Sequence, residues 1–531
     1  MDEVMPRIAA CIVCATLFCL MTLKTLGAMQ QGGYKNGAFV RWLGQKENML
    51  FNRLCVLALC LALASAVSAL CFSFLGVKAA LLVSALPFTA LLLFYLFSDR
   101  KYALKVPLKR TGRINRLFVA YFFIVACAAY IVIAFLTFLA KWNGSEIYAL
   151  IAYVPFALFV PLLPFLLCAA NALIGVFENA RNKKFVKRAG QVLDETKIIR
   201  VGVVGSYGKT SVKNILKTIL SEKYTVVATP ESYNTPIGIA KTVYSEAFAD
   251  KQVLVAEMGA RKTGDIAELC ALVKPDFAIF TGVCEQHMRT FGSVENAFAE
   301  KSEIIKSGAF TVCGEDLKVR VEGAKEKVVF AGESQVENLQ LLPTETKFTL
   351  RLGEEKIEVT TKLLSRAAAE NIALAATLAY EGLGLTVEEI ARGIEKIEQI
   401  PHRLQLIESG GAYILDDGYN SNPVGAKEAL AALARFTGGK CIVTPGLVEC
   451  GVLEEKLNGE LGAQIAAANL DKVVLVGDTL VGAVKNGYLA ANGDSAKLTL
   501  VKTLDEAKTA IAEWIQAGDC VLFLNDLPDV I

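Results

Sequence analysis

The stretch from Ile198 to Leu220 limits the possible folds of this chain more than any other, and it reads IIRVGVVGSYGKTSVKNILKTIL. Its first seven residues are mostly apolar, as in a buried strand, and the apolar residues after Ser211 recur at helical spacing. A glycine turn between a strand and a helix N-terminus favours a loop whose backbone N–H groups hold phosphates. Val203 stands where the full Walker pattern has glycine, so an ordinary strand-to-helix turn is the alternative.

Each residue type in this turn suits nucleotide chemistry. Lysine can neutralise the outer phosphates, and a threonine hydroxyl can bind Mg²⁺. We therefore expect a nucleotide-binding loop made of Gly205, Ser206, Tyr207, Gly208, Lys209, Thr210 and Ser211.

Charge divides the chain into two parts. Residues 1–190 carry a net charge of +14 and residues 191–531 a net charge of −12. A basic, very apolar first third before an acidic remainder predicts a membrane region followed by a region in water. The basic residues flank apolar runs and form no soluble groove, which argues against nucleic acid as a partner.

Five apolar runs in residues 1–178 approach or exceed the roughly 20 residues that span a bilayer. They predict a membrane region with five transmembrane helices over Ile8–Met29, Leu54–Gly76, Val77–Ser98, Leu117–Ala140 and Ile147–Val176.

Loop charges predict the orientation of these helices. Basic residues gather in the segments 30–53 and 99–116, and basic loops remain in the cytoplasm. The N-terminus is then outside, and the residues after the fifth helix are cytoplasmic. A basic linker over residues 179–197 is expected at anionic lipid headgroups, so membrane lipids are expected partners.

The 14 cysteines do not suggest a disulfide framework. Eight of them lie in apolar runs, where cysteine behaves as a small hydrophobic residue. Cys11 and Cys14 have CxxC spacing, but no second pair or nearby histidine accompanies them, which argues against a metal site. Free thiols fit a reducing cytosol.

Beyond residue 198 strand-like and helical patterns alternate, which indicates α/β domains with mainly parallel sheets. Pro401 is a plausible hinge between a central domain, 198–400, and a C-terminal domain, 401–531. The expected helices are Ala367–Tyr380 and Val387–Glu398. The expected strands are Val201–Val204, Tyr224–Ala228, Val253–Glu257, Phe277–Thr281, Phe310–Cys313, Ala412–Asp416, Cys441–Thr444, Lys472–Val476 and Cys520–Leu524.

Seven segments in order resemble the Mur ligases. They are GSYGKTS (205–211), SYNTPIG (232–238), VLVAEMGARKTGDI (253–266), HMRTFGSVENAFAEKSEI (287–304), PHRL (401–404), LDDGYNSNP (415–423) and TPGLVECG (444–451). The resemblance is strongest to the members that add D-alanyl-D-alanine to a UDP-linked muramoyl tripeptide. It implies a P-loop ATP-binding central domain and a Rossmann-like C-terminal domain.

The resemblance also implies a reaction. Mur ligases use ATP to convert a carboxylate into an acyl phosphate, which an amine then attacks to give an amide. By resemblance, Thr210 and Glu257 hold a first Mg²⁺, and His287 and Lys301 hold a second. The lysine is carbamylated in the family, which turns a cation into an oxygen ligand for a hard metal. Arg403 would stabilise charge on the transferring phosphoryl group.

Further residues match nucleotide contacts of the family. His402 and Arg403 match a segment that meets adenine and the γ-phosphate, and Asp417 matches an acid on the ribose. Asn420 falls beside the nucleotide, and Asn371 matches an asparagine on the adenine side. A His-Asn pair of the family is replaced by Ala367 and Ala368, so the adenine contacts differ.

Two departures leave the substrates open. Membrane helices replace the family's UDP-binding domain, and a lysine-glycine-serine stretch that helps to choose the amine is replaced by residues 525–529, NDLPD. We therefore expect a cell-wall precursor that is lipid-linked or otherwise associated with the membrane as the carboxylate substrate, and an amino acid or dipeptide as the amine. Alternatives are a ligase for another envelope polymer such as a poly-amino acid, an ATP-driven membrane transporter or sensor, and an inactive scaffold.

Overall fold

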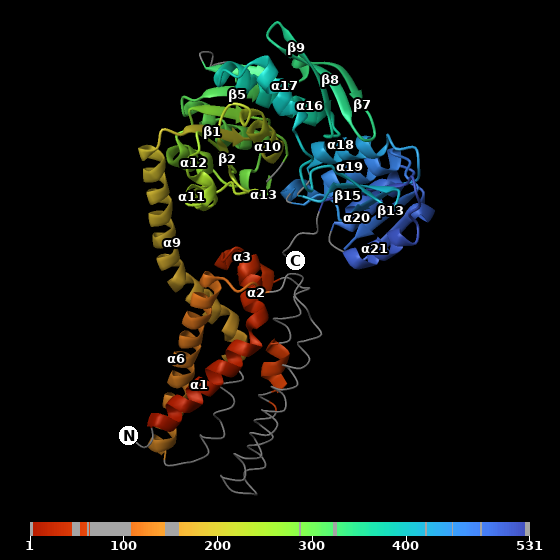
Figure 1. Ribbon diagram of the computed structural model, residues 1–531. Coiled ribbons are helices and arrows are strands. Elements are labelled where there is room, and N and C mark those ends of the chain that lie inside the picture. Colours follow the sequence, from red (N-terminus) through yellow and green to blue (C-terminus); the bar gives the residue numbers. More distant parts are fainter. Residues whose placement is uncertain are drawn as a thin grey trace. The chain divides into compact units, whose positions relative to one another are not determined.

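The computed structural model describes residues 4–44, 54–60, 63, 108–143, 159–285, 288–321, 327–419, 422–448, 450–477 and 480–525. The chain divides into two compact units, Met1–Asn182 and Lys183–Leu527 (Figure 1). The first is helical and the second is built on three sheets.

The first apolar run, predicted as one transmembrane helix, is a bent pair of helices. α1 covers Val4–Met21 and α2 covers Leu23–Gln31, with a bend of 52° between them. At the bend the Thr22 hydroxyl donates to the carbonyl of Phe18 at 2.8 Å and lies 2.9 Å from the Tyr121 hydroxyl. A threonine bonded back to the preceding turn bends a helix, and the side chain wedged beside it adds to the bend.

The other helices of this unit are α3 (Asn36–Leu43), α6 (Gly112–Asn143) and the start of α9 (Leu163–Glu195), which follows a 3₁₀ turn at Val160–Leu162. Among the described residues two helices are long and apolar enough to cross a membrane, or three if the bent pair is one span. The two helices, α6 and α9, correspond to the predicted fourth and fifth runs. The Val77–Ser98 run, most of Leu54–Gly76, and residues 147–158 of the fifth run lie outside the described residues.

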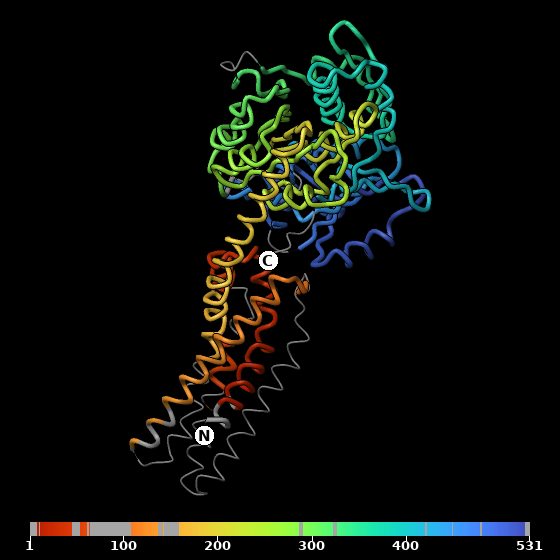
Figure 2. Tube along the Cα trace, turned by 60° about the vertical axis from the view of Figure 1, so that its left-hand side comes forward, coloured from red at the N-terminus to blue at the C-terminus, as the bar shows by residue number. Residues whose placement is uncertain are grey.

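Residues 179–197, expected as a separate linker, continue α9 as far as Glu195. Figure 2 shows this trace running without a break. Ala189 and Leu193 are fully buried in the core of the second unit together with Ile266 and Leu269. The apolar face of this basic segment therefore packs on the following domain, which keeps the segment helical.

The central sheet has six parallel strands in the order β2-β3-β1-β4-β5-β6. β1 (Ile199–Val204) lies between β3 (Val253–Glu257) and β4 (Phe277–Phe280), with Val203 opposite Glu257. The remaining strands are β2 (Val226–Ala228), β5 (Phe310–Gly314) and β6 (Val328–Ala331). Because the strands are parallel, the loops that follow β1, β3 and β4 meet at one edge of the sheet.

Helices cover both faces of this sheet, and neighbouring strand residues enter opposite cores. Val203 packs in the core that contains α10 and α16, whereas Val204 packs in the core that contains α11 and α12. The helices are α10 (Lys209–Leu220), α11 (Pro236–Val243), α12 (Asp265–Val273), α13 (Met288–Phe291), α14 (Val294–Lys301), α15 (Glu303–Lys306), α16 (Arg366–Thr377) and α17 (Val387–Glu395).

A three-stranded antiparallel sheet, β7 (Val336–Leu341), β8 (Thr346–Leu352) and β9 (Glu355–Thr361), was not predicted. Its apolar residues alternate, as Phe348 and Leu350 do, and they join the core that contains α10 and α16.

The C-terminal domain has a six-stranded sheet in the order β10-β11-β15-β12-β13-β14. Only the β10–β11 pair is antiparallel. The strands are β10 (Gln405–Ser409), β11 (Ala412–Asp417), β12 (Lys440–Thr444), β13 (Lys472–Val476), β14 (Leu498–Val501) and β15 (Cys520–Leu524). The helices are α18 (Pro423–Leu433), α19 (Glu454–Ala467), α20 (Val481–Ala490) and α21 (Leu504–Ala512).

Candidate functional site

The glycine turn after β1 is held in place by the strand beside it. Ser206 N donates to Gly282 O at 2.8 Å, and the Thr281 hydroxyl donates to Tyr207 O at 2.5 Å. Gly208 has φ = 74°, a left-handed conformation that favours glycine. A Cβ atom there would lie 2.8 Å from Asn371 Oδ1, so α16 brings the predicted Asn371 directly against the loop.

Lys209 opens α10 with its ammonium turned back to the loop. Its Nζ donates to the carbonyl of Gly205 at 2.7 Å. Burial lowers the pKa of Lys209, and the Glu257 carboxylate opposes that shift. A cation beside backbone N–H groups at a helix N-terminus is suited to the terminal phosphates of a nucleotide.

Glu257 ends β3 beside the loop, and only 1% of it is exposed. The Thr210 hydroxyl donates to Glu257 Oε2 at 3.0 Å, and Asn234 Nδ2 donates to Oε1 at 3.2 Å. A carboxylate and a hydroxyl in contact are oxygen donors of the kind Mg²⁺ prefers, so these residues fit that ion. Thr210, Glu257 and Asn234, separate in sequence, thus form one cluster.

Lys301 ends α14, and 3% of it is exposed. Its Nζ has no hydrogen-bond partner among the described residues and lies 4.8 Å from the centre of the Phe291 ring. Burial lowers the pKa of Lys301 to about 8, and the charge of Lys209 adds to the shift. His287, the predicted companion of Lys301, lies outside the described residues. Within those residues no three His, Cys, Asp or Glu side chains form a metal-binding group.

The C-terminal domain contributes Arg403. Its guanidinium lies 4.4 Å from the centre of the Tyr419 ring, and Nη1 donates to Tyr419 O at 3.3 Å. Burial lowers the pKa of Arg403, and the Arg403 charge in turn contributes to the lowered pKa of Lys209. The Tyr419 hydroxyl donates to Ser232 Oγ at 2.5 Å, which joins the two domains beside the cluster around Glu257.

Two other predicted nucleotide residues of this domain, His402 and Asp417, are held by separate contacts. His402 Nδ1 lies 2.7 Å from Asp416 Oδ2, and its side chain remains mostly exposed. Asp417 is 9% exposed and accepts a hydrogen bond from Leu404 N at 3.1 Å. Asn420 lies outside the described residues.

Sequence reasoning missed two polar contacts of the site. Lys213 Nζ lies 3.2 Å from Glu257 Oε2, and the Tyr207 hydroxyl donates to Asp316 at 2.9 Å. Lys213 stands among the apolar residues of α10, and a lysine in that stripe is the signal that could have identified it. No comparable signal in the sequence identifies Asp316, because only the fold brings it to Tyr207.

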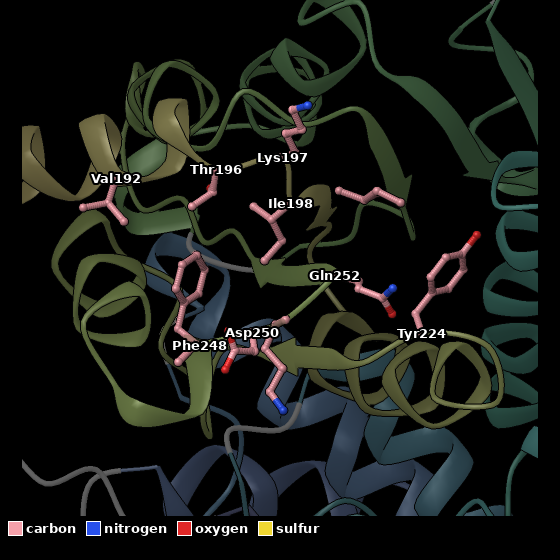
Figure 3. A pocket seen from close by; sticks show the side chains of 11 residues that line it. Val192, Thr196, Lys197, Ile198, Tyr224, Phe248, Asp250 and Gln252 are labelled. Carbon is pink, nitrogen blue, oxygen red and sulfur yellow. The ribbon is translucent and has the colours of Figure 1, made fainter.

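A hollow of about 670 Å³ lies at the opposite edge of the sheet (Figure 3). It is formed before β1 and β3, among Ile198, Tyr224, Phe248 and Gln252. None of the predicted site residues lines it, so the candidate site is the cluster at the carboxyl ends of the strands.

Comparison with known proteins identifies the family of the two α/β domains. A family model described as the Mur ligase middle domain matches residues 203–379, and one described as the Mur ligase, glutamate ligase domain, matches residues 402–525. Together they cover more than half of the chain and leave the helical unit uncovered.

Two curated relatives carry the same name. UDP-N-acetylmuramoyl-tripeptide--D-alanyl-D-alanine ligase of Bacillus subtilis is 28% identical over 339 residues, which are 61% of this chain and 72% of that protein. The Escherichia coli protein of that name is 28% identical over 52% of this chain and 64% of its own length. The crystal structure of MurF ligase from Thermotoga maritima in complex with ADP has a TM-score of 0.59 and 26% identity, covering 66% of this chain and 81% of that one.

Proposed function

Because this chain belongs to the Mur ligase family, we propose that it is an ATP-dependent ligase that forms an amide bond on a cell-wall precursor. The relatives named above add D-alanyl-D-alanine to a UDP-linked muramoyl tripeptide, and we propose the same class of carboxylate and amine here. The observation that carries the proposal is the cluster of Lys209, Thr210 and Glu257 at the glycine turn, with Arg403 of the C-terminal domain near enough for its charge to lower the pKa of Lys209.

The reaction has two steps. A carboxylate oxygen of the precursor attacks the γ-phosphorus, the bond to the β-phosphate oxygen breaks, and ADP leaves. The amine then attacks the carbonyl carbon of the acyl phosphate, phosphate departs with the former carboxylate oxygen, and the amine loses a proton. Lys209 and Arg403 would stabilise the charge that develops on the transferring group.

Thr210 and Glu257 would hold a first Mg²⁺, which when bound neutralises phosphate charge. We further propose a second Mg²⁺ position at His287 and Lys301, with Lys301 carbamylated. Carbamylation requires a neutral amine, and the buried Nζ of Lys301 has its pKa lowered to about 8. Asn371, His402, Asp417 and Asn420 would contact the nucleoside.

The helical unit stands where the family has its UDP-binding domain. We propose that this unit crosses the membrane several times, with the N-terminus outside, and anchors the ligase domains at the cytoplasmic face. We also propose that the precursor is lipid-linked. The apolar α6 and α9, each with basic residues such as Arg113 and Lys184 near one end of its apolar stretch, support this placement.

The test is phosphate release by the purified full chain with ATP, Mg²⁺, a panel of amines, and UDP-linked or lipid-linked muramoyl peptides. We expect phosphate release that requires both an amine and a muramoyl peptide, and that is faster with the lipid-linked peptide than with the UDP-linked one. Lys301→Ala should abolish this coupled turnover and leave ADP binding intact, whereas the exposed Lys306→Ala should behave as wild type. Phosphate release at the same rate without an amine and without a muramoyl peptide would contradict the ligase proposal. Preference for the UDP-linked peptide would contradict the lipid-linked substrate.

A further inference from the structure

We propose that Lys213 is a positioning residue for this reaction. It holds the carboxylate of Glu257 and the 229–235 loop in the arrangement that the Mg²⁺–nucleotide complex requires. The inference rests on the proposed function and adds a residue to it.

The contacts of Lys213 account for its burial. It lies on α10 one turn after Lys209, and 1% of it is exposed. Its Nζ lies 3.2 Å from Glu257 Oε2 and donates to the carbonyl oxygen of Glu231. A buried ammonium is costly unless it is paired and hydrogen-bonded, and these two partners meet that need.

Both carboxylate oxygens and the backbone N–H of Glu257 are hydrogen-bonded or ion-paired to nearby residues. Its Oε2 is shared by Lys213 and Thr210, and its Oε1 accepts from Asn234. Its backbone N–H donates to the Thr229 hydroxyl at 3.0 Å. Lys213 and Thr210 share one oxygen, so the ammonium helps to keep that oxygen beside the glycine loop.

The 229–235 loop depends on the same lysine. Glu231 has φ = 44°, a left-handed conformation that is unfavourable for a residue with a side chain. Its carbonyl is the acceptor for Lys213, so this bond helps to keep the loop in that conformation. The loop carries Asn234 toward Glu257 and Ser232 toward Tyr419 of the C-terminal domain.

These contacts give Lys213 a different role from that of Lys209. Lys209 bonds the glycine loop itself and is placed to meet phosphate, whereas Lys213 is directed at Glu257 and Glu231. Lys213 therefore acts through Glu257 and the loop, and its removal should impair the metal-dependent part of nucleotide binding more than the metal-free part.

The experiment is a double-mutant cycle on the full chain with Lys213→Met and Glu257→Gln. ADP affinity is measured in EDTA and in Mg²⁺, and turnover is measured with saturating substrates. We expect Lys213→Met to leave the affinity in EDTA within about twofold and to lower both kcat and the gain in affinity from Mg²⁺ by about tenfold, the scale of one contact-pair coupling. In the Glu257→Gln background the same change should have less than about a threefold effect.

Lys217→Met is the matched control, because Lys217 is exposed one turn further along α10 and should behave as wild type. Lys213→Gln keeps a donor for the Glu231 carbonyl and replaces the methionine variant if that variant does not fold. Equal losses in the wild-type and Glu257→Gln backgrounds would overturn the proposal, as would equal losses of affinity with and without Mg²⁺. If the wild-type chain forms no amide, the ligase proposal fails, and the ADP arm still decides the role of Lys213.

Discussion

Gly208 offers a test of the loop geometry whose magnitude follows from its backbone conformation and from one contact. At φ = 74°, an alanine costs about 1–2 kcal/mol for the left-handed conformation alone. Its Cβ would also lie 2.8 Å from Asn371 Oδ1, and overpacking of this kind costs about 1–3 kcal/mol. Gly208→Ala should therefore destabilise the protein by roughly 2–5 kcal/mol and weaken ADP binding.

Gly264 is the matched control. It has φ = 93° at the N-cap of α12, and nothing lies within 4 Å of a Cβ atom there. Gly264→Ala should cost only the conformational part, about 1–2 kcal/mol, and leave ADP binding unchanged.

Thermal unfolding and ADP calorimetry on both variants separate the two terms. For a domain of this size 1 kcal/mol corresponds to about 2–4 °C, so the Gly208 variant should melt several degrees below the Gly264 variant. Adding Asn371→Ala to Gly208→Ala should recover most of that difference. Equal melting temperatures for the two glycine variants, or no recovery in the double variant, would refute the contact between Asn371 and the loop.

Two further predictions concern charge. Arg403→Ala should lower kcat by at least about 100-fold with a small change in ADP affinity, because its charge acts on the transferring group; an unchanged kcat in a steady-state assay would remove Arg403 from the mechanism. Burial raises the pKa of Glu370 to about 7, with Glu333 adding to the shift. When the pKa of a carboxyl group is higher in the folded protein than in the unfolded chain, the stability of the protein falls as pH rises through the folded pKa. Glu370→Gln should therefore raise the melting temperature at pH 8 and have little effect at pH 5, and an equal effect at both pH values would contradict this.

Most parallel strands of both α/β domains could be predicted because their apolar runs are continuous and buried. The edge strands β6 and β14 are less buried and were not predicted. Val253–Glu257 and Lys472–Val476 have the predicted bounds, and β1 begins two residues earlier than predicted. The strands β7–β9 were also missed: β7 and β9 are partly exposed, polar residues recur along all three strands, and such a pattern is harder to distinguish from a loop.

In the site, the spacing of a strand, a glycine turn and a helix identified Lys209 and Thr210, because these elements determine their surroundings locally. Glu257 was identified from its place at the end of an apolar strand and from the resemblance to the family. Lys213 and Asp316 could not be placed in this way, since their partners lie 44 and 109 residues away in the chain. Such contacts are created by the sheet order β3-β1-β4-β5, which sequence spacing does not specify.

The bend at Thr22 was not predicted for a different reason. Hydropathy measures apolar character along a run, and Ile8–Met29 passes that test as one span. The bend comes from a hydroxyl that bonds the preceding turn and from Tyr121 of α6, neither of which changes the mean hydropathy.

Oxygen transfer tests the acyl phosphate most directly. The precursor carboxylate is labelled with ¹⁸O, the full chain is supplied with ATP, Mg²⁺ and D-alanyl-D-alanine, and the released phosphate is analysed by mass spectrometry. We expect one ¹⁸O atom in each phosphate, with one ADP and one amide formed per turnover. Phosphate that carries no label, released at the same rate without the precursor, would contradict the assignment of this chain as an amide ligase.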